Sequence, residues 1–126
     1  MNINNMTLGE LREINSLFNT KDATNSKIDK KLIGKKVITR TYSAGVHYGT
    51  LTEKEGHEVI LKNARRLYYW KTINNGISLS SVAMFGLSDE SKVCFKVTNQ
   101  WLVAVEIIPC SDESIKSIEG KNEYRV

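Results

Sequence analysis

The side chains best suited to hold a ligand gather in one short run, Asn63-Ala-Arg65-Arg66-Leu-Tyr68-Tyr69-Trp70. Guanidinium groups form forked hydrogen bonds with phosphate oxygens, and aromatic rings stack on nucleobases for roughly 1 to 3 kcal/mol per base. Alternation along a strand would place Arg66, Tyr68 and Trp70 on one face and Arg65 on the other. The run therefore predicts a nucleotide site. The alternative, in which its apolar and aromatic members belong to the core and the arginines only flank it, stays open.

A second cluster is Arg40-Thr-Tyr42-Ser43-Ala44-Gly45-Val-His47-Tyr48-Gly49. Its small residues would let a ligand approach the backbone closely, and Arg40, Tyr42 and His47 could converge on it. An ordinary hairpin is the alternative. A third segment, Phe85 to Ser91, could close over a bound base by stacking Phe85, and the alternative there is a buried phenylalanine.

The predicted ligand-binding residues follow from these three segments. They are Arg40, Tyr42, Ser43, Ala44, Gly45, His47, Arg65, Arg66, Tyr68, Trp70, Phe85 and Ser91. Arg65 and Arg66 would neutralise phosphate with support from Arg40, while Tyr42, Tyr68, Trp70 and Phe85 would stack.

Features of catalysis and metal binding are missing from the sequence, which has no phosphate loop, nucleophile elbow or HExxH motif. His47 and His57 are each isolated from other metal-ligand types, so no metal site and no cofactor is expected. Glu106 lies within an apolar segment. A carboxylate placed there needs a partner or solvent, so we expect it to pair with a basic group or to lie at an exposed edge, with ligand contact as the alternative.

The charge of the chain is unevenly distributed. The net charge is +4, but residues 27–71 alone carry eleven basic and four acidic side chains, whereas residues 1–26 and 72–126 sum to −1 and −2. Such a segment predicts an anion-binding surface, with a solvated lysine face as the alternative.

Composition limits the class of protein. A chain of 126 residues with 40% apolar residues makes one small domain rather than a multidomain enzyme. No apolar run approaches the roughly 18 residues of a membrane span, and the polar start resembles no signal peptide, so we expect no membrane partner and an intracellular protein. Cys94 and Cys110 are then expected to be reduced.

The beginning of the chain predicts a helical arm. Thr7 and Glu10 have the spacing of a capping box. The apolar residues that follow recur at three- and four-residue steps, which is typical of one helix face, and they are Leu8, Leu11, Ile14, Leu17 and Phe18. Residues 19–31 are polar and read as a linker. We therefore expect an arm and linker at 1–31, packed on its own domain or on a neighbouring copy, and a β-rich ligand-binding domain at 32–126.

The rest of the chain predicts an antiparallel sheet with a short helix. β-branched and alternating segments separated by turns indicate strands at 36–42, 46–52, 58–62, 65–71, 92–98 and 102–108. The last of these is almost wholly apolar and is expected to be central and covered on both faces. Helices are expected at 78–85, ending at Gly86, and in the tail after Ser111, from Asp112 and Glu113 through Ile118. The fold class is α+β: an N-terminal helix plus a bent antiparallel sheet or small open barrel with a short second helix.

Three motifs carry a resemblance: the run from Val37 to Leu51, the run Asn63-Ala-Arg-Arg-Leu-Tyr-Tyr-Trp70, and Glu106-Ile-Ile-Pro-Cys110. Over about residues 34–118 the chain resembles a widespread family of small phage and prophage proteins without an assigned function. It also looks like the Thoeris anti-defence type of phage protein, whose members act as sponges. That resemblance implies sequestration, without cleavage, of cyclic ADP-ribose signals from bacterial TIR-domain enzymes, or of cyclic oligonucleotides, by a homo-oligomer. No individual residue is carried over.

The preferred interpretation is a sponge for a cyclic nucleotide signal, acting as a dimer or hexamer in the cytoplasm of a host cell. The first alternative is a small nucleic-acid-binding module, although nucleic acid is the less favoured ligand. The second is a phage inhibitor that docks on a host protein through its aromatic residues. An enzyme is the least favoured class, because no pair of nucleophile and base is visible.

Overall fold

The computed structural model describes residues 28–73 and 78–124. By compactness the chain divides into units at 1–31 and 32–126. The described part is mainly β-sheet with two short helices, neither of which is long and apolar enough to cross a membrane. The elements, in chain order, are β2 (Lys36–Thr41), β3 (Val46–Glu55), β4 (Glu58–Tyr69), α2 (Leu79–Phe85), β5 (Lys92–Cys94), β6 (Val97–Pro109), α3 (Asp112–Glu119) and β7 (Glu123–Tyr124). The predicted N-terminal helix lies outside the described residues.

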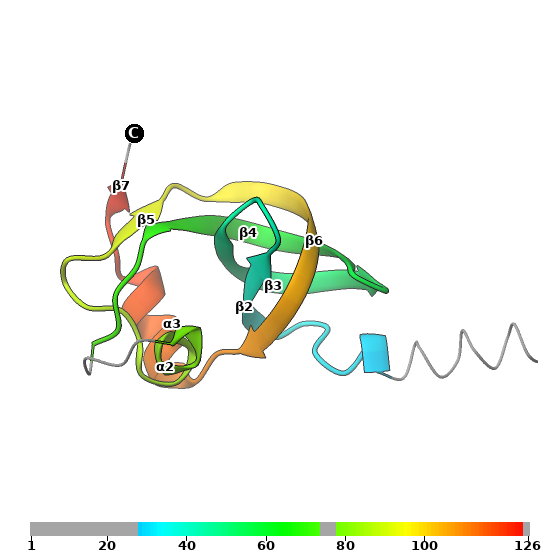
Figure 1. The fold of residues 1–126 in the computed structure, drawn as a ribbon, viewed down its shortest axis with the longest axis horizontal. Coiled ribbons are helices and arrows are strands. Elements are labelled where there is room, and N and C mark those ends of the chain that lie inside the picture. The colour runs from blue at the N-terminus through cyan, green and yellow to red at the C-terminus, as the bar shows by residue number, and fades with distance from the viewer. Residues whose placement is uncertain (1–27, 74–77, 125–126) are drawn as a thin grey trace, which may run out of the picture. The chain divides into compact units, whose positions relative to one another are not determined.

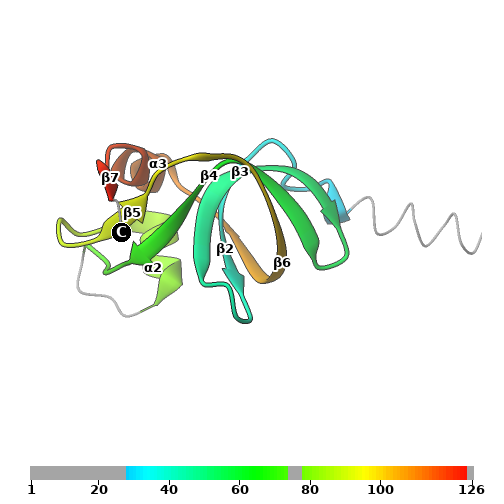
Figure 2. The same ribbon diagram turned by 90° about the horizontal axis from the view of Figure 1, so that it is seen from above.

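The strands form one strongly bent sheet in the order β3-β2-β6-β4-β5-β7, and β3 also pairs with β4 (Figures 1 and 2). The pairings are antiparallel except for the parallel pair of β5 and β7. The bent antiparallel sheet is confirmed. The alternative of a small open barrel is wrong, because the six strands form a sheet and not a barrel.

The bend is made where β3 and β4 pass very close to each other. A Cβ atom on Gly49 would lie 3.0 Å from the Leu61 Cβ and 3.1 Å from the Lys62 carbonyl oxygen, so a larger residue there would require the opposing strand to shift. Opposite it, Asn63 has a φ of 54°, and the β3–β4 register shifts between Tyr48 and Thr50. The two strands predicted at 58–62 and 65–71 are therefore one strand with an irregularity in its middle.

The two faces of the sheet bury two separate clusters. The helix-side core joins Ile38, Tyr48 and Leu67 of the sheet to residues of α2 and α3. The inner core lies on the opposite face and includes Val37 and Leu61. Successive residues of a strand point to opposite faces, so Val37 and Ile38 enter different cores. Between the register shifts of β2, β3 and β4, this alternation assigns each residue to a side.

The helices have local start and stop signals. The Ser78 hydroxyl accepts from the Ser81 N–H at the start of α2, and Gly86, with a φ of 103°, ends it. Ser111 caps α3 in the same way. The two helices contact each other through a 2.6 Å hydrogen bond from the Ser114 hydroxyl to the Val82 carbonyl. Both predicted helices of the second unit are confirmed.

Strand β6 only partly matches its prediction. It lies between β2 and β4, as expected for a central strand. However, Trp101, Val103 and Val105 are 60%, 47% and 51% exposed, so the prediction that both faces are covered is wrong. The helices lie at one end of the sheet, and β6 extends beyond them (Figure 1).

Candidate functional site

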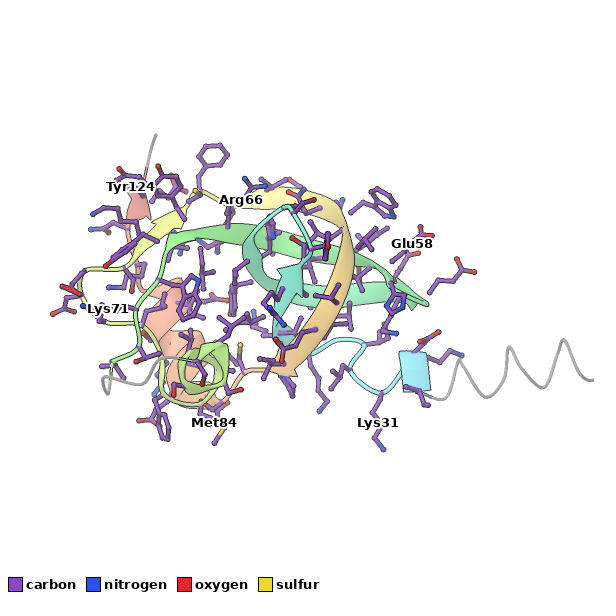
Figure 3. The ribbon with its side chains drawn as sticks, viewed as in Figure 1. Lys31, Glu58, Arg66, Lys71, Met84 and Tyr124 are labelled. Carbon is purple, nitrogen blue, oxygen red and sulfur yellow. The ribbon has the colours of Figure 1, made fainter. Side chains whose placement is uncertain are left out.

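Three polar side chains lie side by side across β2, β3 and β4. Thr39 pairs with His47, and His47 pairs with Arg66, so all three occupy the inner face of the sheet. The Arg66 Nε donates to the His47 Nε2 at 3.2 Å, and the Thr39 hydroxyl donates to the His47 carbonyl at 3.4 Å. Thr39 and His47 are buried. Arg66, labelled in Figure 3, is exposed. We call Thr39, His47 and Arg66 the polar row. It runs from the buried side chain of Thr39 to the exposed guanidinium of Arg66.

His47 is held neutral in the polar row. Burial, and then the charge of Arg66, lower the pKa of His47 to about 4. Because Nε2 accepts from Arg66, the proton of the neutral ring lies on Nδ1. Among the described residues this buried N–H has no hydrogen-bond partner. An unpaired buried donor costs about 1–3 kcal/mol, so the row holds a donor that an oxygen atom would satisfy.

We expect acid to destabilise the protein through His47. Its folded-state pKa lies below its usual value of 6.5, so between pH 6.5 and about 4 the unfolded chain binds more protons. Acidification across this range should therefore remove on the order of 3 kcal/mol of stability. Urea unfolding at several pH values measures this loss. Because carboxylates also titrate there, the readout is the difference from His47→Gln, which should have a shallower pH slope; equal slopes would contradict the assignment.

The turn between β2 and β3 is rigid and displays one aromatic ring. The Thr41 hydroxyl accepts from the Ala44 N–H at 2.7 Å and donates to the Gly45 carbonyl at 2.9 Å. Gly45 has a φ of 85°, which favours glycine. Tyr42 is 92% exposed, and Ser43 and Ala44 are exposed beside it. The turn could therefore present Tyr42 and several backbone groups to a ligand.

Arg40 lies on the opposite face of β2 from Thr39 and does not join the polar row. Its Nε binds the Glu106 carboxylate at 3.0 Å, with both side chains about half exposed. The expectation that Glu106 pairs with a basic group is confirmed. Arg40 and His47, predicted to converge, are therefore on different sides of the sheet.

Arg65 is almost wholly buried, with 2% of its surface exposed. Its guanidinium donates to three backbone carbonyls, those of Cys94 at 2.8 Å, Ile118 at 3.0 Å and Lys121 at 3.1 Å. Burial lowers the pKa of Arg65. The side chain joins β4 to the end of β5 and to the C-terminal end of α3, so the two adjacent arginines have different surroundings.

The aromatic candidates on and after β4 also lie in different surroundings from one another. The Tyr68 ring is 55% exposed and stacks on Tyr124 with centroids 5.3 Å apart. The β4–β5 register shifts between Leu67 and Tyr69, and Trp70, which follows, packs against the helix-side core. The predicted alternation therefore does not extend to Trp70. Phe85, at the end of α2, is 43% exposed.

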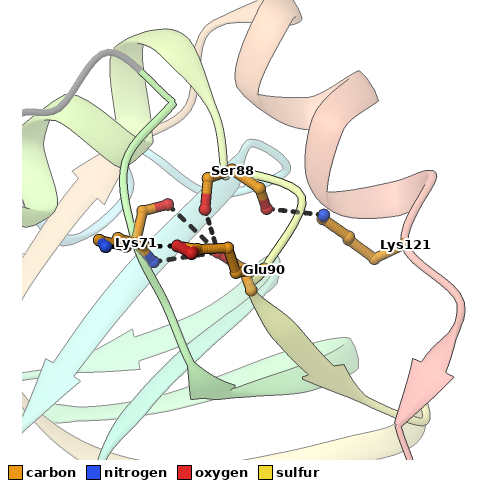
Figure 4. Close-up of polar contacts among 5 residues, drawn as sticks. Lys71, Ser88, Glu90 and Lys121 are labelled. Atoms are coloured by element: carbon orange, nitrogen blue, oxygen red, sulfur yellow. Dashed lines mark hydrogen bonds and ion pairs between the residues drawn. The ribbon is translucent and has the colours of Figure 1, made fainter.

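Ser91 belongs to a loop that is held by polar contacts, and Figure 4 draws those of its neighbours Ser88 and Glu90 with Lys121 and Lys71. Its buried hydroxyl accepts from the Lys71 N–H at 3.0 Å and donates to the Lys71 carbonyl at 3.1 Å. The Lys121 ammonium donates to the Ser88 carbonyl at 2.7 Å, and that of Lys71 lies 3.3 Å from Glu90. The hydroxyl of Ser91 thus holds the chain after β4 against this loop.

The structure therefore brings His47 and Arg66 together and adds Thr39, which the sequence analysis missed. The signal was present, since Thr39 is two residues after the core residue Val37 and must share its face. Arg65, Trp70, Phe85 and Ser91 lie in other surroundings. In the described part of the chain, no three histidine, cysteine or carboxylate side chains are grouped to hold a metal ion.

The comparison with known proteins finds a family match over about the same residues as the sequence resemblance. A family model for a domain of unknown function matches residues 34–118, from just before β2 to near the end of α3. No curated protein and no solved structure matches the chain. Since that match covers most of the sequence, the chain belongs to the family of the domain of unknown function DUF6948.

Proposed function

We propose that this protein binds an anionic nucleotide through the exposed guanidinium of Arg66 and holds it without cleaving it. The observation that carries the proposal is the 3.2 Å hydrogen bond from the Arg66 Nε to the neutral imidazole of His47. This bond fixes the plane of the guanidinium, and the terminal nitrogens of a fixed guanidinium can fork onto two phosphate oxygens. His47 is thus a positioning residue, and its unpartnered Nδ1 marks a place where an oxygen atom would be stabilised.

Aromatic side chains would supply the contact to the base. Tyr68 lies two residues after Arg66 on β4, and its stacking on Tyr124 limits the freedom of its ring. Tyr42 is the most exposed ring, at the tip of a rigid turn. Arg65 has no part in the proposal, because its donors already bind backbone carbonyls.

The ligand class we propose is a cyclic ADP-ribose or cyclic oligonucleotide signal, and the role is that of a sponge that lowers its free concentration. In this proposal the protein is phage- or prophage-encoded and acts in the host cytoplasm against signalling by TIR-domain enzymes. This part rests on the sequence resemblance alone, whereas the anion site rests on the geometry of Arg66 and His47.

Calorimetry of the full chain with cyclic ADP-ribose and with a cyclic dinucleotide tests the proposal. Arg66→Gln should weaken binding at least about tenfold, because a hydrogen bond to a charged group contributes about 1.5–3 kcal/mol. Arg40→Gln is the matched control, since it removes a guanidinium already bound by Glu106 and should leave affinity nearly unchanged. The bound nucleotide should be recovered intact after denaturation.

Other results would point elsewhere. No heat with either nucleotide, or equal affinity in both arginine variants, would contradict a nucleotide site at Arg66. Recovery of a cleaved nucleotide would indicate an enzyme. Steeply salt-dependent binding of single-stranded DNA or RNA, with no binding of the small nucleotides, would favour the nucleic-acid module.

A further inference from the structure

The outer side of β4 and β6, beyond the helices, is an exposed sheet face. Its register pairs are Glu58 with Val103, Ile60 with Trp101, and Lys62 with Asn99. The intervening residues Val59, Leu61 and Leu102 point into the inner core. We call the six paired residues the β4–β6 outer face. In Figure 3 Glu58 lies at the opposite end of the molecule from Met84 and Tyr124, which mark the region of the helices and of β7.

The centre of this face is apolar. Trp101 is 60% exposed and Val103 47%, and Ile60 lies partly buried beside Trp101. The Trp101 indole N–H donates to the Glu58 carboxylate at 3.1 Å, which orients the ring across the strands. Exposed tryptophans held in one orientation on an apolar patch are typical anchors of protein interfaces. The face lies on the opposite side of the sheet from the polar row.

The charges of the β4–β6 outer face are self-complementary. When a second copy is turned by 180° against the first, its acidic end faces the basic end of the first copy. On β4 an acidic residue, Glu58, lies on one side of Ile60 and a basic residue, Lys62, on the other. Glu55 on β3 pairs with Glu58, so the Glu58 end is the more acidic, while Glu53 lies level with Ile60 at the centre. A two-fold axis across the strands at Ile60 and Trp101 would set each Glu58 against the Lys62 of the other copy. Such an isologous contact repeats every favourable pair twice.

We propose that the β4–β6 outer face is a homodimer interface, with Trp101 and Ile60 at its centre and Glu58 and Lys62 paired reciprocally between two copies. The partner is a second copy of this chain because the charge pattern is self-complementary. Since the contact does not use Arg66, the interface and the nucleotide site can be tested separately.

Sedimentation velocity of the full chain over a range of micromolar concentrations tests the interface. The wild type should be a dimer. Trp101→Gln should weaken it at least about tenfold, as expected for loss of a central anchor. Lys62→Glu should also weaken it, because it places carboxylates against each other at both ends. Lys116→Glu, on the exposed side of α3, makes the same charge change elsewhere and should leave the dimer intact.

The decisive variant is the charge exchange Glu58→Lys with Lys62→Glu. In the two-fold arrangement it restores opposite charges at both ends, so it should dimerise more tightly than Glu58→Lys alone, which equally lacks the hydrogen bond to Trp101. A double variant no tighter than the single one overturns the reciprocal arrangement. A wild type that stays monomeric at about 100 μM, or a dimer unaffected by Trp101→Gln and Lys62→Glu, overturns the interface. Unchanged circular dichroism in each variant separates lost association from lost folding.

Discussion

Replacing Arg65 with methionine is expected to lower the free energy of unfolding by about 3–5 kcal/mol. The guanidinium binds three carbonyls, on Cys94, Ile118 and Lys121, in a position with 2% of the residue exposed. Methionine fills much of the volume but offers no donor, so these acceptors lose their partners in a place that water reaches poorly. The end of β5 and the residues after α3 would then lose these side-chain contacts to β4, although β5 would still pair with β4 in the sheet.

The neighbouring arginine provides the matched control for this prediction. Arg66→Met makes the same chemical change on an exposed side chain that has one hydrogen bond, to His47, and we expect a smaller loss of about 1 kcal/mol. Urea unfolding of both variants, followed by circular dichroism and tryptophan fluorescence, measures the difference. Equal losses in the two variants would mean that the carbonyl contacts of Arg65 contribute little.

Replacing Gly86 with alanine is expected to cost about 3 kcal/mol or more, from two sources that add. The residue has a φ of 103°, which a side chain disfavours, and an added Cβ would lie 2.6 Å from the Ser117 Cβ. Ser117 cannot move freely, because its hydroxyl accepts from the Leu87 N–H at 2.9 Å. The substitution should therefore push α3 away from the end of α2.

Gly45→Ala distinguishes the cost of the positive φ from the cost of the steric clash. Gly45 has a similar φ of 85°, but an added Cβ there would meet nothing within 4 Å. Its variant should lose only the conformational part, about 1–2 kcal/mol. Thermal unfolding of the two variants should give a clearly lower midpoint for Gly86→Ala, and matching midpoints would show that the helices adjust to the extra methyl group.

The local elements could be predicted because their signals are local. Ser78 and Gly86 mark the ends of α2 by capping chemistry, and β-branched alternation marks β2 and β3. The continuity of β4 could not be predicted in the same way. Its polar residue with positive φ, Asn63, looks in the sequence like the end of a strand, and only pairing with β3 and β6 holds the chain extended through it.

In the candidate site, too, one part could be predicted from local sequence signals and another could not. Alternation correctly separates Arg65 from Arg66, but it cannot tell which face α2 and α3 will cover, because both faces of this segment carry aromatic residues. That choice depends on helices far along the chain. The outer side of β6 was misjudged for a related reason, since an apolar run such as Leu102 to Ile108 is the same whether its second face meets a helix of its own chain or a different surface.

The pairing of β2 with β6 sets an order of events during synthesis. Ile38 leaves the ribosome long before its neighbour Ile108, and until then one edge of β2 has unpaired N–H and C=O groups. Pairing of segments so far apart slows folding, and an open strand edge can recruit other chains in the meantime. The β2–β3 hairpin can form from adjacent residues, but β6 is synthesised only when nearly the whole chain has left the ribosome. Until then β2 lacks its neighbour on that edge of the sheet.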